Sequence, residues 1–137
     1  MFPSTLQIHT FIRLALAVVY IWFGMLKFFP SASPAEGLAQ NTIDHLFLSF
    51  FTPKLAIVLL AGWEVLIGIM LLANKWMKLA IGAALVHMAF TFTPLFLFPE
   101  LCFTSAPFAF TLVGQYIVKN LVFIGALLLL YPQQKQQ

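Results

Sequence analysis

The stretch LLAGWEVLIGIML, residues 59–71, decides the fold class. Twelve of its thirteen residues are apolar or glycine, and the thirteenth is Glu64. The surrounding apolar run continues over residues 55–73, about the 20 residues that a membrane-spanning helix needs. A carboxylate in such surroundings is costly unless it has a partner or a function. The stretch is therefore either a membrane helix with a functional charge or a soluble core with a satisfied acid.

The composition decides between these two possibilities. Of the 137 residues, 62% are hydrophobic and only 8% are charged. Soluble domains carry roughly 25% charged residues, so this chain cannot cover a water-facing surface. Its length predicts a single transmembrane domain over residues 1–137. The net charge of +3 includes no basic patch, so no nucleic acid is expected as a partner. Cys102 is the only cysteine, which excludes an internal disulfide and a redox dithiol.

Four segments are long and apolar enough to cross a bilayer. We predict spans at about residues 11–30, 55–73, 79–98 and 108–131. The first span exceeds the apolar core of a signal peptide and has little positive charge ahead of it, so we expect it to be retained.

The orientation follows from the positive charges. Lys75 and Lys78 occupy the short loop between the second and third spans, whereas the next loop contains Glu100 and no Lys or Arg. Arg13 and Lys135 lie toward the two ends of the chain. Positively charged loops favour the cytoplasmic side. We therefore expect a multi-pass protein of the inner (plasma) membrane with both termini cytoplasmic.

The first outer loop contains a further helix signal. Ser33, Pro34 and Glu36 match a capping box with proline at the first helical position. Apolar residues then recur at helical spacing: Leu38, Ile43, Leu46, Phe47, Phe50 and Phe51. The pattern predicts an amphipathic helix over about residues 34–52 on the outer membrane face. The predicted fold class is all-α, a polytopic membrane four-helix bundle with this additional helix.

Each predicted span carries a polar side chain near its middle. Tyr20, Glu64, His87 and Lys119 lie about 12–16 Å from one end of their spans, at 1.5 Å per residue. The hydrocarbon layer is about 30 Å thick, so these four groups fall at one level near its centre. Small residues on the same helix faces allow close helix packing. The sequence therefore predicts a bundle with a polar centre.

We expect Glu64 to pair with Lys119 in this centre. The further members of the candidate ligand site are Tyr20, His87, Gln115 and Asn120. Arg13 and Lys27 flank the site, nearer the membrane surfaces, where their charges can snorkel. The histidines and acids are too scattered for a metal site. The polar groups either fix only the helix register or bind a ligand or proton, and the sequence leaves both readings open.

The segments RLALAVVYIWFGMLKFFP, AGWEVLIGIMLL and GQYIVKNLVFIGALLLL resemble the DoxX-like family of small four-helix membrane proteins, including its YkgB-type branch. The resemblance covers about residues 13–130. Its anchors are Arg13, Gly24, Lys27, Glu64, Gly68 and Lys119. It implies an inner-membrane bundle with cytoplasmic termini. The name-giving member is similar to a subunit of thiosulfate:quinone oxidoreductase, and other members are associated with sulfur or oxidative-stress redox systems.

These observations lead to a functional expectation with two alternatives. We expect a quinone- or lipid-contacting accessory subunit of a redox or stress-related membrane assembly. Its partners would be the bilayer, a quinone, a redox protein and, on assembly, further copies of the chain. The alternatives are a small proton-coupled transporter and a structural or assembly protein with a purely structural Glu–Lys pair. The spans contain no cysteine pair or haem-ligand pair, so whether the chain is itself an enzyme stays open.

Overall fold

The computed structural model describes residues 3–33 and 36–131 and is mostly helical, as predicted. The elements are α1 (Thr5–Leu26), α2 (Glu36–Leu46), α3 (Pro53–Ala73), α4 (Met77–Phe92), α5 (Pro94–Leu97), α6 (Pro99–Cys102), β1 (Phe103–Ser105), β2 (Ala109–Phe110) and α7 (Leu112–Leu130). Pro34 of the predicted capping box and Lys135 of the charge argument lie outside the described residues.

Four helices are long and apolar enough to cross a membrane: α1, α3, the continuous stretch Met77–Leu97 formed by α4 and α5, and α7. Three of them lie close to the predicted ranges. The exception is α1, which begins at Thr5 and ends at Leu26, whereas the prediction was 11–30.

The early start of α1 has a local cause. The Ser4 hydroxyl accepts the backbone N–H of Gln7 at 3.3 Å, and the Gln7 side chain accepts the backbone N–H of Ser4 at 2.8 Å. This reciprocal pair is a capping box, which satisfies two of the N–H groups that a helix start leaves without partners. The more polar residues 5–10 therefore belong to the same helix as the apolar segment that follows them.

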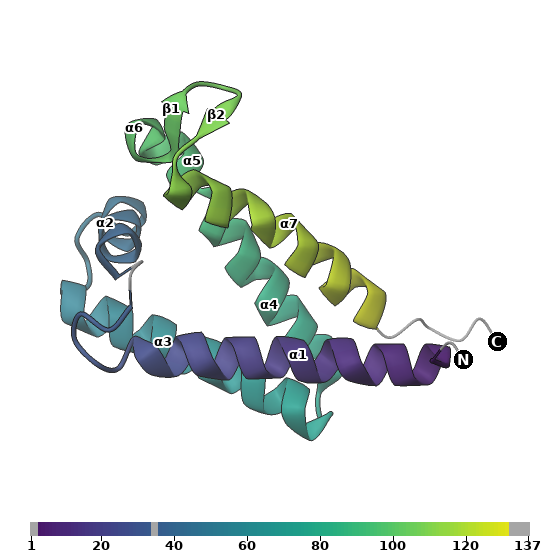
Figure 1. Ribbon diagram of the computed structural model, residues 1–137. Helices are drawn as coiled ribbons and strands as arrows, with labels where there is room; N and C mark the ends of the chain where they lie inside the picture. Colours follow the sequence, from purple (N-terminus) through teal and green to yellow (C-terminus); the bar gives the residue numbers. More distant parts are fainter. Residues whose placement is uncertain (1–2, 34–35, 132–137) are drawn as a thin grey trace.

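The long helices form two antiparallel pairs, α1 with α3 and α4 with α7 (Figure 1). The first pair is very close because glycines lie at its contact. A Cβ placed on Gly68 would lie 2.5 Å from Ile21 Cγ1 and 2.9 Å from the Ile21 nitrogen, and one placed on Gly24 would lie 3.0 Å from Glu64 Cβ. Small residues permit this backbone approach. The first turn of α1 and the last turn of α7 lie at the same end of the molecule (Figure 1).

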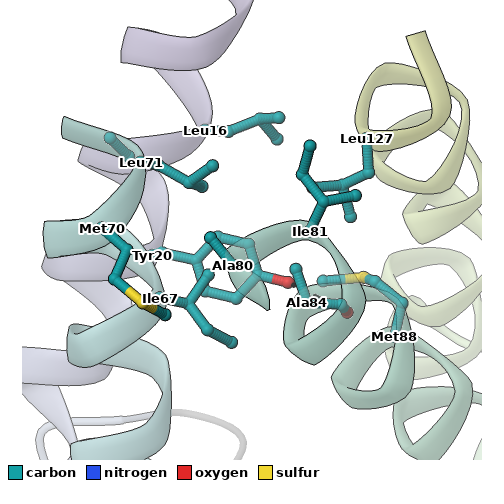
Figure 2. Close-up of a cluster of buried hydrophobic side chains, with 11 residues drawn as sticks. Leu16, Tyr20, Ile67, Met70, Leu71, Ala80, Ile81, Ala84, Met88 and Leu127 are labelled. Carbon is teal, nitrogen blue, oxygen red and sulfur yellow. Dashed lines mark hydrogen bonds between the residues drawn. The ribbon is translucent and has the colours of Figure 1, made fainter. Parts of the chain in front are cut away.

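The two pairs meet in one apolar cluster to which all four long helices contribute (Figure 2). Its buried members are Leu16, Ala17, Tyr20, Ile67, Met70, Leu71, Ala80, Ile81, Ala84, Met88 and Leu127. Tyr20 extends from α1 across this cluster, and its hydroxyl ends beside Ala84 of α4 (Figure 2). The cluster therefore fixes the position of a polar group among apolar neighbours.

The outer connections differ from the prediction in detail. The helix predicted over about 34–52 is seen as the shorter α2, because Leu48 and Ser49 take positive φ angles of 50° and 59° and end it. The connection before α7 contains the short helix α6 and the antiparallel hairpin β1–β2, neither of which was predicted, whereas α5 completes the predicted third span. Pro94 and Pro99 begin α5 and α6, since proline interrupts a helix and favours the first turn of the next one.

Candidate functional site

Glu64 lies in the middle of α3 and receives a hydrogen bond on each carboxylate oxygen. Lys27 Nζ donates to Oε2 at 2.6 Å, and His87 Nε2 lies 2.9 Å from Oε1. The three side chains are nearly buried, with exposed fractions of 10% for Lys27, 8% for His87 and 7% for Glu64. The carboxylate therefore joins the end of α1, the centre of α3 and the centre of α4.

The prediction that Glu64 pairs with Lys119 is wrong. Lys27 takes the position expected for Lys119, and its nearly buried ammonium binds Glu64, whereas we expected that it could extend to a membrane surface. The cause is the register between α1 and α3. Gly24 lies against the Glu64 backbone region, so the carboxyl end of α1 lies beside the middle of α3. Depths counted along each span assumed that all spans begin at the same level, and α1 does not.

A signal for this register was present in the sequence. The Ser4 capping box places the start of α1, and the glycines at 24 and 68 mark where two helices can touch. Aligning these two contact points brings Lys27 next to Glu64. Reasoning from the depth of isolated charges alone missed it.

A hydrogen-bond chain continues from His87 to Tyr20. The Tyr20 hydroxyl lies 3.4 Å from His87 Nδ1 and 3.5 Å from the carbonyl oxygen of Ala84. The two rings pack edge to face with centroids 5.6 Å apart. The four side chains Lys27, Glu64, His87 and Tyr20 are called the Glu64 cluster from here on.

The cluster can hold one additional proton without leaving a polar atom unsatisfied. When His87 is neutral with its proton on Nε2, it donates to Glu64 and its Nδ1 accepts the hydrogen bond of the Tyr20 hydroxyl. When Nδ1 is also protonated, the hydroxyl can turn toward the Ala84 carbonyl and accept from Nδ1 instead. Tyr20 therefore has one suitable orientation for each protonation state of His87.

Aromatic side chains also pack against His87. The Trp63 ring lies edge to face against His87 with centroids 5.8 Å apart, and Phe90 lies 6.3 Å from Trp63. Trp63 is half-buried and Phe90 is exposed, so this aromatic row runs from the cluster to the molecular surface. In the described part of the chain every buried side-chain nitrogen and oxygen has a hydrogen-bond partner.

The remaining predicted site residues lie outside the Glu64 cluster. Asn120 donates to Thr91 Oγ1 at 3.2 Å and links α7 to α4. Gln115 and Lys119 are exposed on α7, where Lys119 Nζ lies 5.4 Å from the centroid of the Tyr116 ring. The structure therefore brings together Tyr20, Glu64 and His87 of the predicted six.

Arg13, predicted as a flanking charge, binds the end of α3. Its Nη1 donates to the carbonyl oxygens of Leu71 and Leu72 at 2.5 and 3.0 Å. The last carbonyls of a helix have no partner within the helix and carry partial negative charge, so a guanidinium is favourable there. Arg13 thereby fixes the register that places Lys27 beside Glu64.

A shallow apolar groove lies between α1 and α7. It has a volume of about 130 Å³ and is lined by Ala15, Leu16, Val19, Val122, Phe123 and Ala126. Leu16 lies one helical turn before Tyr20. The groove therefore begins within one turn of the α1 residue that ends the hydrogen-bond chain.

Cys102 lies in α6, outside the Glu64 cluster. Its side chain is fully buried, and its Sγ donates to the Pro94 carbonyl at 3.5 Å. Burial raises the pKa of the thiol, and the nearby Glu100 raises it further. Within residues 3–33 and 36–131 no group of three His, Cys, Asp or Glu side chains is arranged to hold a metal ion.

The chain matches no protein-family model, no curated protein and no solved structure. The DoxX-like resemblance therefore remains a prediction that rests on the sequence alone.

Proposed function

We propose that the chain is a multi-pass membrane protein that contacts a quinone or a lipid as an accessory subunit of a redox or stress-related membrane assembly. The observation that supports this most is the Glu64 cluster, a buried carboxylate bound by Lys27 and His87 in the middle of apolar helices. Ionisable groups inside a membrane are expensive and usually mark a ligand or proton site. Two members of the cluster, Lys27 and Glu64, are also anchors of the DoxX-like resemblance.

In this proposal Tyr20 and His87 bind the polar head of the ligand. The Tyr20 hydroxyl makes long and therefore weak hydrogen bonds, at 3.4 and 3.5 Å. It therefore loses little hydrogen-bond energy when it turns to a ligand oxygen. Glu64 holds the His87 ring in place and keeps its Nε2 protonated. A bound quinone would supply the redox chemistry, since the chain has a single, buried cysteine. The apolar chain of such a ligand is proposed to lie against the groove between α1 and α7, whose lining residues are all apolar.

The proposed location is the inner (plasma) membrane with both termini cytoplasmic. Four helices of sufficient length and apolarity support a multi-pass arrangement. Lys75 lies in the turn between α3 and α4 and Lys78 in the first turn of α4, so this end of the molecule is expected to face the cytoplasm.

A second candidate function is structural: the Glu64 cluster would only hold α1, α3 and α4 together. The complete satisfaction of buried side-chain polar atoms in the described part of the chain favours this candidate. It predicts no saturable ligand binding at the cluster. The two candidates therefore separate in a binding experiment.

The test uses Trp63 as a reporter, because its ring lies 5.8 Å from the His87 ring. Replacing Trp22 and Trp76 by Phe leaves Trp63 as the only tryptophan. The protein is placed in phosphatidylcholine nanodiscs and titrated with ubiquinone, which quenches tryptophan fluorescence. We expect saturable quenching, with an apparent Kd that rises in Glu64→Gln.

The matched control is Glu100→Gln, which removes an exposed carboxylate outside the cluster and should leave the Kd unchanged. Quenching that rises linearly with quinone and is equal in all variants would mean collision within the bilayer. That result would reject the quinone proposal and favour the structural candidate.

A further inference from the structure

Lys119 is an exposed cation on a helix that is long and apolar enough to span a membrane. The chain has four carboxylate side chains, Glu36, Asp44, Glu64 and Glu100, and all belong to the described residues. The ion pairs found there are those of Glu64 with Lys27 and with His87. No carboxylate side chain of this chain therefore pairs with Lys119 in the described structure.

The depth of Lys119 makes this exposure costly. It is the eighth residue of α7, about 10 Å from the beginning of the helix and about 16 Å from its end. Gln115 lies one turn earlier on the same face and is also exposed. Tyr116, 62% exposed, packs beside the ammonium and satisfies it only in part. An amide and an ammonium thus lie together on the outer face of a span.

We propose that this Gln115–Lys119 face of α7 docks a second membrane-spanning helix that presents a carboxylate at the same level. The proposal builds on the accessory-subunit function and names the chemistry of the partner. The same principle operates within the chain, where the Asn120 amide binds Thr91 between α7 and α4. Polar side chains bonding across helices are a common means of association in membranes.

Charge and depth favour a protein helix over a lipid head group. A carboxylate on a neighbouring helix can lie at the level of Lys119. One of its oxygens can then pair with the Lys119 ammonium, and the other can accept a hydrogen bond from the Gln115 side-chain amide. The phosphate of an anionic lipid stays at the membrane surface, about 10 Å from the Lys119 backbone. α7 is also the least buried of the four long helices, so most of its surface is open to a partner.

The experiment measures binding of a synthetic Leu-rich membrane-spanning peptide to the full-length protein in phosphatidylcholine vesicles. One peptide carries a single central Glu, and a matched peptide carries Leu there. A donor dye on Ser105→Cys, in a Cys102→Ala background, reports energy transfer to an acceptor on the peptide. Ser105 is exposed in β1, outside the helix that carries the docking face. We expect roughly 3- to 20-fold tighter binding of the Glu peptide, the range of single polar contacts between membrane helices.

Lys119→Gln should abolish this preference, and Lys78→Gln, at the exposed start of α4, should keep it. Equal binding of both peptides, or a preference that survives Lys119→Gln, would overturn the proposal. It would also be overturned if the Glu preference were missing and Lys119 instead drove self-association or retention of phosphatidylglycerol. Quinone titration of Lys119→Gln separates this proposal from the proposed function, because Lys119 lies outside the Glu64 cluster and the titration should be unchanged.

Discussion

The pairing of Lys27 with Glu64 predicts a strong energetic coupling between two residues 37 positions apart. In Glu64→Gln the side chain keeps its shape but retains only one acceptor oxygen, so either Lys27 or His87 loses its partner. Leaving a buried charge without its partner costs about 3–5 kcal/mol. Because Lys27 lies at the end of α1 and is 10% exposed, it can relax in part, and we expect about 2–3 kcal/mol.

The double variant Lys27→Met with Glu64→Gln removes both charges and leaves His87 bound to the amide. Its loss in free energy of unfolding should be smaller than the sum of the losses in the two single variants, and the difference, the coupling energy, should be about 1–2 kcal/mol. The assay is reversible unfolding of the full-length protein in mixed micelles with increasing SDS, followed by circular dichroism. Lys119→Gln serves as control, because Lys119 is not bonded to Glu64 and should show no coupling to it. Zero coupling for Lys27, or a larger coupling for Lys119, would refute the register between α1 and α3.

Three further predictions concern packing and reactivity. Gly68→Ala should destabilise the protein by about 1–3 kcal/mol because its Cβ would meet the α1 backbone. Gly62→Ala should be neutral or stabilising because a Cβ there has nothing within 4 Å. Equal effects of the two substitutions on the free energy of unfolding in SDS would contradict this packing. Arg13→Met should cost about 1–2 kcal/mol in the same assay by removing two hydrogen bonds to the end of α3, and an unchanged free energy of unfolding would count against that cap. Because the pKa of the Cys102 thiol is raised, a smaller fraction of this thiol is thiolate at pH 8 than in a free cysteine. Buried Cys102 should therefore react with maleimide far more slowly than a cysteine placed at the exposed position 105 by Ser105→Cys in a Cys102→Ala background. Comparable rates would show that Cys102 is accessible.

Much of the helical content could be predicted because long apolar helices are easily recognised in the sequence. An uninterrupted apolar run of sufficient length predicts a span with little ambiguity, and three of the four long helices lie close to the predicted ranges. The start of α1 was missed because Thr5 to Thr10 is more polar, and its extent depends on the Ser4 capping box. The β1–β2 hairpin was missed because its strands are only three and two residues long.

The candidate site was predictable in its members but not in its pairing. Tyr20, Glu64 and His87 were identified from their depth, since polar groups inside apolar spans stand out. Their partner depended on how far α1 is displaced along α3, and that displacement is set by tertiary contacts at Gly24 and Gly68. Lys119 has the right depth, but it lies on the outer face of α7. Depth can be counted along one helix, whereas the register requires knowing which two faces touch.

The proposed binding of a quinone at the Glu64 cluster is tested most directly by mass spectrometry of small molecules that co-purify with the protein. The proposal predicts near-stoichiometric quinone on the wild type, a clear loss in Glu64→Gln and no loss in Glu100→Gln. Quinone that is absent from the folded wild type, or present equally in Glu64→Gln, would contradict the proposal and leave the cluster as a structural link between α1, α3 and α4.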